Sequence, residues 1–516
     1  MRFLAVLAAA AALAGADYDW LIRNARVVDG AGNPWFRADV AVTDGRIAAI
    51  GKLTAATTGR SIDAAGRVLA PGFIDVHTHV EAGVERFPGE NFLRDGVTTV
   101  VTGNCGSSQI RLGEFFARLD KQGLALNLAS LVGHNSIRRE ILGLADRQAT
   151  AQELARMRAL VEQAMRDGAA GFSTGLEYVP GTYSSTEVIV ELARAAAAHG
   201  GLYATHMRDE GDQVLEAITE AARVGREAGL RVQVSHFKQD TRRLWGSAGR
   251  MIALVEQFRA EGVDVVVDQY PYEAFSTGLG MTLPSWALEG GDAGLRRRLA
   301  DTAVRARIVA DMERLVKAKG HESFAYARVA SCRFDRSLEG RTIPEIALAR
   351  GRPATLAAEI DTILEIMAQG GASAVYHSMS GPDVERILGY PHTAVASDGG
   401  IVEFGSGVPH PRSYGTNARV LAEYVGRRRL LGLEEAIRKM TSLPARTFAF
   451  RDRGLVREGL AADLVLFDPA RVGDRATFDK PHQYADGFDL VLVNGVAVVE
   501  DGRLAGARPG RVLRRQ

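Results

Sequence analysis

The chain has 516 residues, of which 46% are hydrophobic and 24% are charged, and this is the composition of an ordinary globular protein with a large core. The formal net charge is only +1 and no basic tract is present, which argues against a nucleic-acid partner. The 56 glycines against 16 prolines are typical of many tight strand-to-helix turns and argue against a disordered chain.

Residues 1–16 have the pattern of a secretory signal. One early positive charge at Arg2 precedes an apolar stretch with small residues at Ala14 and Ala16, which predicts cleavage before Asp17. The stretch is short for a membrane span, so we expect export to the periplasm without stable membrane insertion. The alternative interpretation is an apolar N-terminal helix.

Both ends of the remaining chain are rich in short strands separated by turn residues. These strands are expected at residues 20–29, 38–42 and 46–51 near the N-terminus, and at 462–468 and 491–503 near the C-terminus. We predict one small β-domain built from both termini, residues 17–70 and 451–516.

An apolar run from Val68 to Val80 ends in Asp75, His77 and His79. Residues two apart in a strand share a face, so both histidines project together from its C-terminal end. This is the end at which a parallel barrel keeps its chemistry. A lone pair of histidines at this spacing is also common by chance, so its meaning depends on the strands that follow.

Residues 71–450 alternate β-branched runs, glycine-rich turns and amphipathic stretches, which predicts a parallel sheet with helical crossovers. Eight strands are expected, the number of a (β/α)8 TIM-type barrel of the α/β class. A ninth run at 374–378 has no place in this pattern, and residues 285–352 interrupt it as an insertion over the barrel mouth. The eight strands are expected to end near His79, Cys105, His134, Glu177, His206, His236, Tyr272 and Asp398.

Three later strands also close on ligand-type residues, namely His206, His236 and Asp398. Each alone is more often a structural histidine or a capped strand end. Together with the first histidine pair they would converge at one barrel mouth, where a cluster of imidazoles and a carboxylate suits zinc.

Six short motifs carry a family resemblance that extends over nearly the whole mature chain. The chain resembles the amidohydrolase superfamily and, within it, the N-acyl-D-amino-acid deacylases (D-aminoacylases). The motifs are GVTTVVTGNCG at 96–106, THMR at 205–208, SHFK at 235–238, YPY at 270–272 with ST at 276–277, SDG at 397–399 and PHPR at 409–412.

The resemblance implies a tight zinc site formed by Cys105, His206 and His236. It also implies a second, weaker metal site formed by His77, His79 and Asp398. Many members of the superfamily bridge two metals with a carbamylated lysine. The only lysine between His79 and His206 is Lys121, within a helical stretch, so a thiolate is the natural substitute.

The resemblance further implies zinc-dependent hydrolysis of the amide bond of N-acyl-D-amino acids, with Asp398 moving a proton from the attacking water to the leaving amine. A helix cap before Gly399 is the alternative role for Asp398.

The resemblance also implies that four residues hold the α-carboxylate of this small-molecule substrate. They are Lys238, Tyr270, Ser276 and Arg412. Without the resemblance, Lys238 and Arg412 would be interpreted as solvated surface charges.

The apolar stretch from Met281 to Leu288 is expected to line or cover the side-chain pocket and favour apolar D-residues, or else to form the core of the insertion. The chain departs from part of the family at 273–275 and at Gly381–Pro382, which bears on side-chain preference. Other possible functions are hydrolysis of cyclic amides or D-configured dipeptides, and a non-enzymatic binding role. The sequence indicates no oligomeric state.

The two cysteines allow two interpretations. In an oxidising compartment Cys105 and Cys332 could form a disulfide. A disulfide sulfur cannot also be the zinc ligand, so we expect Cys332 to be a small buried thiol without a cross-link.

Overall fold

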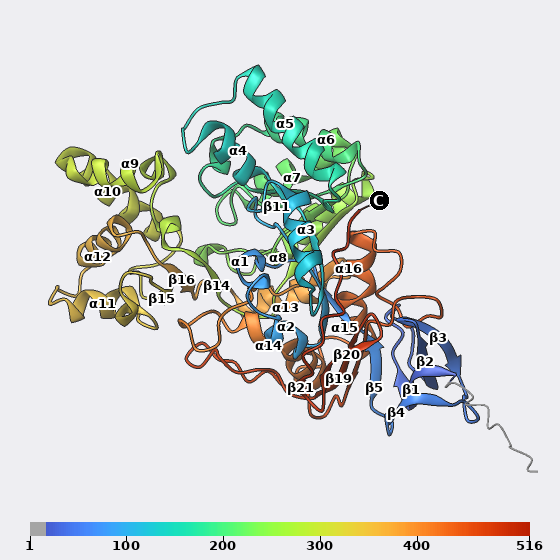
Figure 1. The fold of residues 1–516 in the computed structure, drawn as a ribbon. Coiled ribbons are helices and arrows are strands. Elements are labelled where there is room, and N and C mark those ends of the chain that lie inside the picture. The colour runs from blue at the N-terminus through green and yellow to red at the C-terminus, as the bar shows by residue number, and fades with distance from the viewer. Residues whose placement is uncertain (1–16, 516) are drawn as a thin grey trace, which may run out of the picture.

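The computed structural model describes residues 17–515, so the expected signal at residues 1–16 lies outside the described part of the chain. Within 17–515, no helix is both long enough and apolar enough to cross a membrane. The described chain forms a barrel, a β-domain at its base and a projecting insertion (Figure 1).

Eight parallel strand positions surround the barrel axis, which confirms the predicted barrel. Two hydrogen-bonded sets make up the ring, and β8 continues into β9 after Leu131 alone. The ring closes between the first and last strands, where His79 N donates to Gly399 O at 2.8 Å and Asp398 N donates to His77 O at 2.8 Å. The strands are β6 (Phe73–Asp75), β7 (Val97–Thr102), β8 (Asn127–Ser130), β9 (Val132–Gly133), β10 (Gly171–Gly175), β11 (Leu202–His206), β12 (Val232–Val234), β13 (Val265–Gln269) and β17 (Thr393–Val395).

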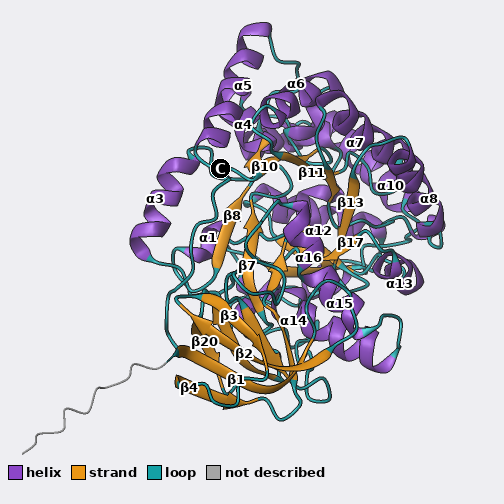
Figure 2. Cartoon of the chain, turned by 90° about the vertical axis from the view of Figure 1, so that its right-hand side faces the viewer, coloured by secondary structure: helices purple, strands orange, loops and turns teal. Residues whose placement is uncertain are grey.

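Every residue of these barrel strands is buried, as expected for strands that are covered by helices on one side and fill the barrel on the other. Helices surround the ring (Figure 2). They are α1 (Glu81–Val84), α2 (Glu90–Leu93), α3 (Leu112–Gln122), α4 (His134–Leu142), α5 (Ala151–Arg166), α6 (Thr186–Ala197), α7 (Val214–Ala228), α8 (Ala248–Ala260), α13 (Gly381–Gly389), α14 (Arg412–Arg419), a π-helix (Val420–Arg427), α15 (Leu433–Met440) and α16 (Ser442–Thr447).

Helix α5 shows how local sequence sets an element boundary. The Thr150 hydroxyl accepts a hydrogen bond from Glu153 N at 3.3 Å, and the Glu153 carboxylate accepts one from Thr150 N at 2.9 Å. This reciprocal pair satisfies two backbone donors that a helix start leaves without partners.

The β-domain is one nine-stranded sheet to which both termini contribute, as predicted. The N-terminal and C-terminal halves meet where β5 pairs antiparallel with β18. The strands are β1 (Tyr18–Val27), β2 (Phe36–Thr43), β3 (Arg46–Gly51), β4 (Thr58–Asp63), β5 (Val68–Pro71), β18 (Leu464–Phe467), β19 (Phe488–Val493), β20 (Val496–Glu500) and β21 (Arg503–Leu504).

A buried polar junction joins this sheet to the barrel. The Asp463 carboxylate accepts hydrogen bonds from Asn127 of β8 at 3.0 Å and from Asn494 N at 2.7 Å, and it forms an ion pair with Arg453. The chain then returns to the barrel, where Val512 bridges to Leu128 of β8.

The insertion is larger than the 285–352 segment that interrupts the sequence pattern. It contains a separate antiparallel sheet in the order β14–β16–β15, and the run at 374–378 that had no place in the barrel overlaps β16. Its elements are β14 (Phe275–Gly278), α9 (Gly291–Ala300), α10 (Thr302–Ala318), β15 (Ala327–Ser331), α11 (Ile343–Ala349), α12 (Leu356–Ala368) and β16 (Ser373–Tyr376).

Candidate metal centre

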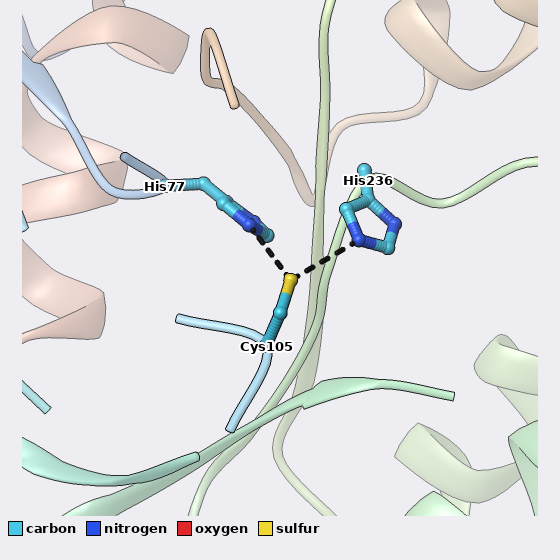
Figure 3. Close-up of side chains that lie close together, drawn as sticks. All are labelled: His77, Cys105 and His236. Atoms are coloured by element: carbon cyan, nitrogen blue, oxygen red, sulfur yellow. Dashed lines mark hydrogen bonds between the residues drawn. The ribbon is translucent and has the colours of Figure 1, made fainter. Parts of the chain in front are cut away.

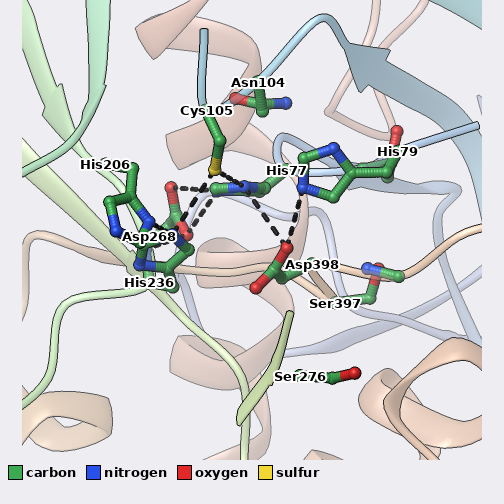
Figure 4. Close-up of polar contacts among 12 residues, drawn as sticks. His77, His79, Asn104, Cys105, His206, His236, Asp268, Ser276, Ser397 and Asp398 are labelled. Atoms are coloured by element: carbon green, nitrogen blue, oxygen red, sulfur yellow. Dashed lines mark hydrogen bonds and ion pairs between the residues drawn. The ribbon is translucent and has the colours of Figure 1, made fainter. Parts of the chain in front are cut away.

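The barrel brings the six expected metal ligands together at the C-terminal ends of its strands (Figure 4). His206 is the last residue of β11, and the other five follow the ends of β6, β7, β12 and β17. The six expected ligands are His77, His79, Cys105, His206, His236 and Asp398.

The Cys105 sulfur lies at the centre of the first half of the cluster (Figure 3). Its Sγ is 3.3 Å from His77 Nε2 and 3.5 Å from His236 Nε2. His206 completes this half, with Nδ1 at 2.8 Å from His236 Nε2. The three residues of the expected tight site are therefore adjacent, and His77 joins them.

Asp398 lies at the centre of the second half. Its Oδ1 is 3.0 Å from His79 Nε2 and 3.5 Å from His77 Nε2. His77 thus contacts both halves, so the two expected sites form one continuous cluster.

The donor set fits zinc. Zinc bonded tetrahedrally to thiolate and imidazole holds the two ligand atoms about 3.5 Å apart. The sulfur-to-nitrogen distances of Cys105 match this spacing. Within residues 17–515, three groups of three side chains could hold a metal ion, and the ligand atoms of each group lie within 4.8 Å of one another. The third group adds Glu210 to His206 and His236.

The protein environment holds Cys105 and Asp398 in the forms that bind a cation. Burial opposes ionisation of the Cys105 thiol, but His77 and His236 lower its pKa well below the usual value. Burial likewise opposes ionisation of Asp398, but Arg412 and His77 lower the pKa of this carboxyl well below its usual range. A thiolate and a carboxylate result.

A carboxylate lies behind each of three histidines; Asp268 and Glu210 are buried, and Glu177 is partly exposed. Asp268 is 3.3 Å from His77 Nδ1, Glu177 is 2.9 Å from His206 Nε2 and Glu210 is 2.9 Å from His236 Nδ1. In each ring the other nitrogen faces the cluster. Carboxylates placed in this way fix the tautomer and the orientation of a histidine ligand.

These three carboxylates have no role in the sequence-based site. Glu177 and Asp268 lie at the ends of β10 and β13, so their strand positions could have indicated them. Glu210 lies in the loop after β11 and nothing local marks it. Asp75 lies beneath the cluster, where it accepts hydrogen bonds from Ser397 N at 3.1 Å and from His77 N at 3.2 Å, so it supports the backbone there.

Three site residues have an unusual backbone conformation. Cys105, His236 and Asp398 have φ values of 52°, 34° and 51°, in the left-handed region that non-glycine residues rarely adopt. Such strain persists where the surrounding structure enforces it, and it gathers at functional sites. Gly106 is required beside Cys105 because a Cβ there would lie 2.2 Å from the Asn135 side chain.

The four expected substrate-binding residues also reach this region. Arg412 is 5% exposed and its Nη1 is 2.8 Å from Asp398 Oδ2, while Nη2 donates to Ser276 O at 3.2 Å. Its guanidinium lies 4.7 Å from the centre of the Tyr270 ring. Lys238 is 3% exposed and forms an ion pair with Glu210. Neither Lys238 nor Arg412 is a solvated surface charge.

Two adjoining cavities open onto the cluster. One, of about 350 Å³, is lined by Cys105, His236 and Asp398. The other, of about 340 Å³, reaches Arg412. They share His79, Ser276 and Asp398, so a molecule in the first cavity has access to both the metal ligands and the buried arginine.

Comparison with known proteins agrees with this geometry. The model of the amidohydrolase family matches residues 60–499. The D-aminoacylase of Alcaligenes xylosoxydans xylosoxydans is 36% identical over 96% of this chain and 98% of its own. The N-acyl-D-glutamate deacylase of the same organism is 36% identical over 96% of both chains.

Two solved structures are similar over nearly their full length. A crystal structure of D-aminoacylase has a TM-score of 0.83 at 36% identity, covering 96% of this chain and 100% of that one. The N-acyl-D-glutamate deacylase of Bordetella bronchiseptica, complexed with zinc and a phosphonate inhibitor, has a TM-score of 0.82 at 35% identity, covering 96% and 99%.

The two cysteines should respond differently to replacement. Both are buried free thiols, and Cys332 lies after β15 in the insertion. Cys105→Ala should remove the bound zinc, measured by elemental analysis of purified protein, because it deletes the thiolate ligand. Cys332→Ala should retain zinc and cost at most about 1–2 kcal/mol of unfolding free energy. Full zinc content in Cys105→Ala, or a Cys105–Cys332 cross-link in active protein, would refute this ligand assignment.

Replacement of a carboxylate behind a ligand should weaken zinc binding without removing a ligand. Glu177→Ala should lower zinc affinity about 10–100-fold, measured by competition with a chromophoric chelator, because the His206 ring loses its orienting partner. Glu177→Gln should recover part of the loss, since an amide oxygen can accept the same hydrogen bond. The matched control is Glu187→Ala on the exposed face of α6. Equal affinities in all four proteins would show that Glu177 does not position His206.

Proposed function

This chain belongs to the amidohydrolase family, and we propose that it hydrolyses the amide bond of N-acyl-D-amino acids at its zinc centre, releasing a carboxylate and a free D-amino acid. The observation that carries the proposal is the buried Arg412 guanidinium, 2.8 Å from Asp398 beside the metal ligands. An amide substrate with a free α-carboxylate fits both features. The similar D-aminoacylase and N-acyl-D-glutamate deacylase support this substrate class.

The histidines, Cys105 and Asp398 would hold the metal. Zinc, when bound, supplies a Lewis acid that polarises the amide carbonyl and acidifies a water molecule. The residues around the cluster bind and orient the substrate and move its protons.

Arg412 has donor capacity left for the substrate. Its Nη1 is buried and close to Asp398, yet it makes no well-aligned hydrogen bond. A planar guanidinium binds a carboxylate through paired N–H donors. The α-carboxylate of the substrate can therefore bind the Arg412 guanidinium beside Ser276 and Tyr270. Lys238 supplies a second positive charge.

The same contact prepares Asp398 for proton transfer. Arg412 is the strongest favourable influence that holds the pKa of Asp398 low, and a strongly acidic carboxyl is a weak base. A substrate carboxylate that engages Arg412 weakens this influence and raises the basicity of Asp398. Asp398 can then accept the proton of the attacking water and deliver it to the leaving amine nitrogen.

A cyclic amide fits the site less well. It offers no free α-carboxylate, so it would leave the buried Arg412 without its partner. The hydantoinases that this structure also resembles are 20% identical or less and show a common fold alone.

Removal of the carboxylate-binding arginine should impair catalysis without removing the metal. Arg412→Ala should raise the barrier in kcat/KM for N-acetyl-D-leucine by about 2–4 kcal/mol, because a buried charge partner is lost. The control is Arg156→Ala on the exposed face of α5, which should behave as wild type. N-acetyl-L-leucine should be a poor substrate. Unchanged kcat/KM in Arg412→Ala, or equal turnover of the two enantiomers, would contradict this assignment.

We propose that residues 1–16 direct export and that the mature protein works in the periplasm. The support is the signal-like sequence, together with the start of the first strand β1 at Tyr18, so cleavage before Asp17 would leave this strand intact. Mass spectrometry of protein from a periplasmic fraction should find Asp17 at the N-terminus. Recovery only from the cytoplasm, with residues 1–16 retained, would refute the proposal.

A further inference from the structure

A third cavity lies between the insertion and the barrel mouth. It has a volume of about 500 Å³ and adjoins the cavity at the metal ligands, with which it shares Tyr178, Val179 and Thr277. We call it the insertion pocket. Its position is suited to a part of the substrate that extends away from the reacting amide.

One wall of the insertion pocket is apolar. The residues of this wall come from β14, from the segment after it, from α10 and from the loop that follows α10. They include Phe275, Met281, Leu283, Leu288, Val316 and Phe324. The segment from Met281 to Leu288 therefore lines the insertion pocket.

Most charged side chains of the insertion pocket form ion pairs within the protein. Lys319 forms an ion pair with the buried Asp240, and Asp212 forms one with Arg243. Arg208 binds Glu220 through two hydrogen bonds of 2.7 and 2.9 Å.

The two remaining acids of the pocket also have partners. Glu177 binds His206 at 2.9 Å, and Asp209 accepts a hydrogen bond from Gly211 N at 2.7 Å. Both cations that line the insertion pocket, Arg208 and Lys319, are therefore paired within the protein, so the pocket offers no free positive charge to a side-chain carboxylate.

Strand β14 connects the insertion pocket to the carboxylate site. Side chains alternate between the two faces of a strand. Ser276 lines the cavity that contains Arg412, whereas Phe275 and Thr277 line the insertion pocket. A substrate whose α-carboxylate binds Arg412 near Ser276 can therefore extend its side chain past β14 into the insertion pocket.

We propose that the insertion pocket binds the side chain of the D-amino acid and selects large, uncharged, apolar residues, with the Lys319–Asp240 pair excluding acidic ones. This inference rests on the proposed function. Asp240 neutralises the one lysine that would otherwise attract a side-chain carboxylate. An unpaired carboxylate buried against the apolar wall would be strongly unfavourable.

A substrate panel tests the selection. Zinc-loaded protein should be assayed with the N-acetyl derivatives of D-leucine, D-phenylalanine, D-alanine, D-glutamate and D-lysine. The kcat/KM values for the D-leucine and D-phenylalanine derivatives should exceed the value for the D-alanine derivative by at least about tenfold. They should exceed the values for the D-glutamate and D-lysine derivatives by at least about 100-fold. Preference for D-glutamate, D-lysine or D-alanine would overturn the inference and leave the proposed function intact. Hydrolysis of none of them would instead refute the proposed function.

Two variants test the residues. Asp240→Asn should free Lys319 and raise the kcat/KM ratio of D-glutamate to D-leucine by at least about tenfold. Leu288→Lys should lower kcat/KM for D-leucine by at least about tenfold while zinc content stays unchanged. Leu348→Lys, an exposed change elsewhere in the insertion, should behave as wild type.

The two variants are independent, so failure of one to fold leaves the other decisive. An unchanged ratio in folded Asp240→Asn would overturn the role of the Lys319–Asp240 pair. An unchanged kcat/KM for D-leucine in folded Leu288→Lys would overturn the assignment of the insertion pocket to the side chain.

Discussion

The balance of buried charge at the barrel mouth is the constraint on which the site depends. Cys105 and Asp398 are held as anions among His77, His79, His206 and His236, nearly all of them shielded from water. Buried charges of this density are stable only when each has a partner or a metal. Three further carboxylates, Asp268, Glu177 and Glu210, extend the balance outward because they lie 2.9–3.3 Å from the outer nitrogens of the histidines. A cation at the centre of this arrangement completes it.

The rest of the fold keeps these groups in place. The ring closes by backbone hydrogen bonds that involve His77, His79 and Asp398 themselves, so these expected metal ligands lie where the first and last barrel strands meet. The Asp75 carboxylate stabilises the same junction by accepting hydrogen bonds from the backbone N–H groups of Ser397 and His77. Strained backbone at Cys105 can persist because tightly packed glycines and the surrounding strands allow no other path. Rigid strands thus position ligands with a precision that loops alone would not provide.

Specificity is assigned to a different part of the molecule from catalysis. The barrel supplies the metal ligands and Arg412, whereas the insertion supplies the apolar wall and Lys319 of the insertion pocket. Strand β14 belongs to the insertion, and its Ser276 carbonyl accepts a hydrogen bond from Arg412. The barrel and the insertion therefore meet where the Cα atom of the proposed substrate would lie. Changes in the insertion can therefore alter the accepted side chain while the reaction stays the same.

The sequence by itself determined the barrel and the two-ended β-domain, because strand periodicity is a local property. The chemistry at strand ends predicted that His77, His79, His206, His236 and Asp398 converge, and the family resemblance added Cys105 to this predicted ligand set. His206, His236 and Asp398 could be found since each closes an apolar run. The tertiary structure alone decided which groups surround them. Glu210 meets His236, Asp240 meets Lys319 across 79 residues, and Arg412 is buried against Asp398. Such contacts depend on how distant segments pack, and a polar residue in a loop carries no local signal of the partner that will neutralise it.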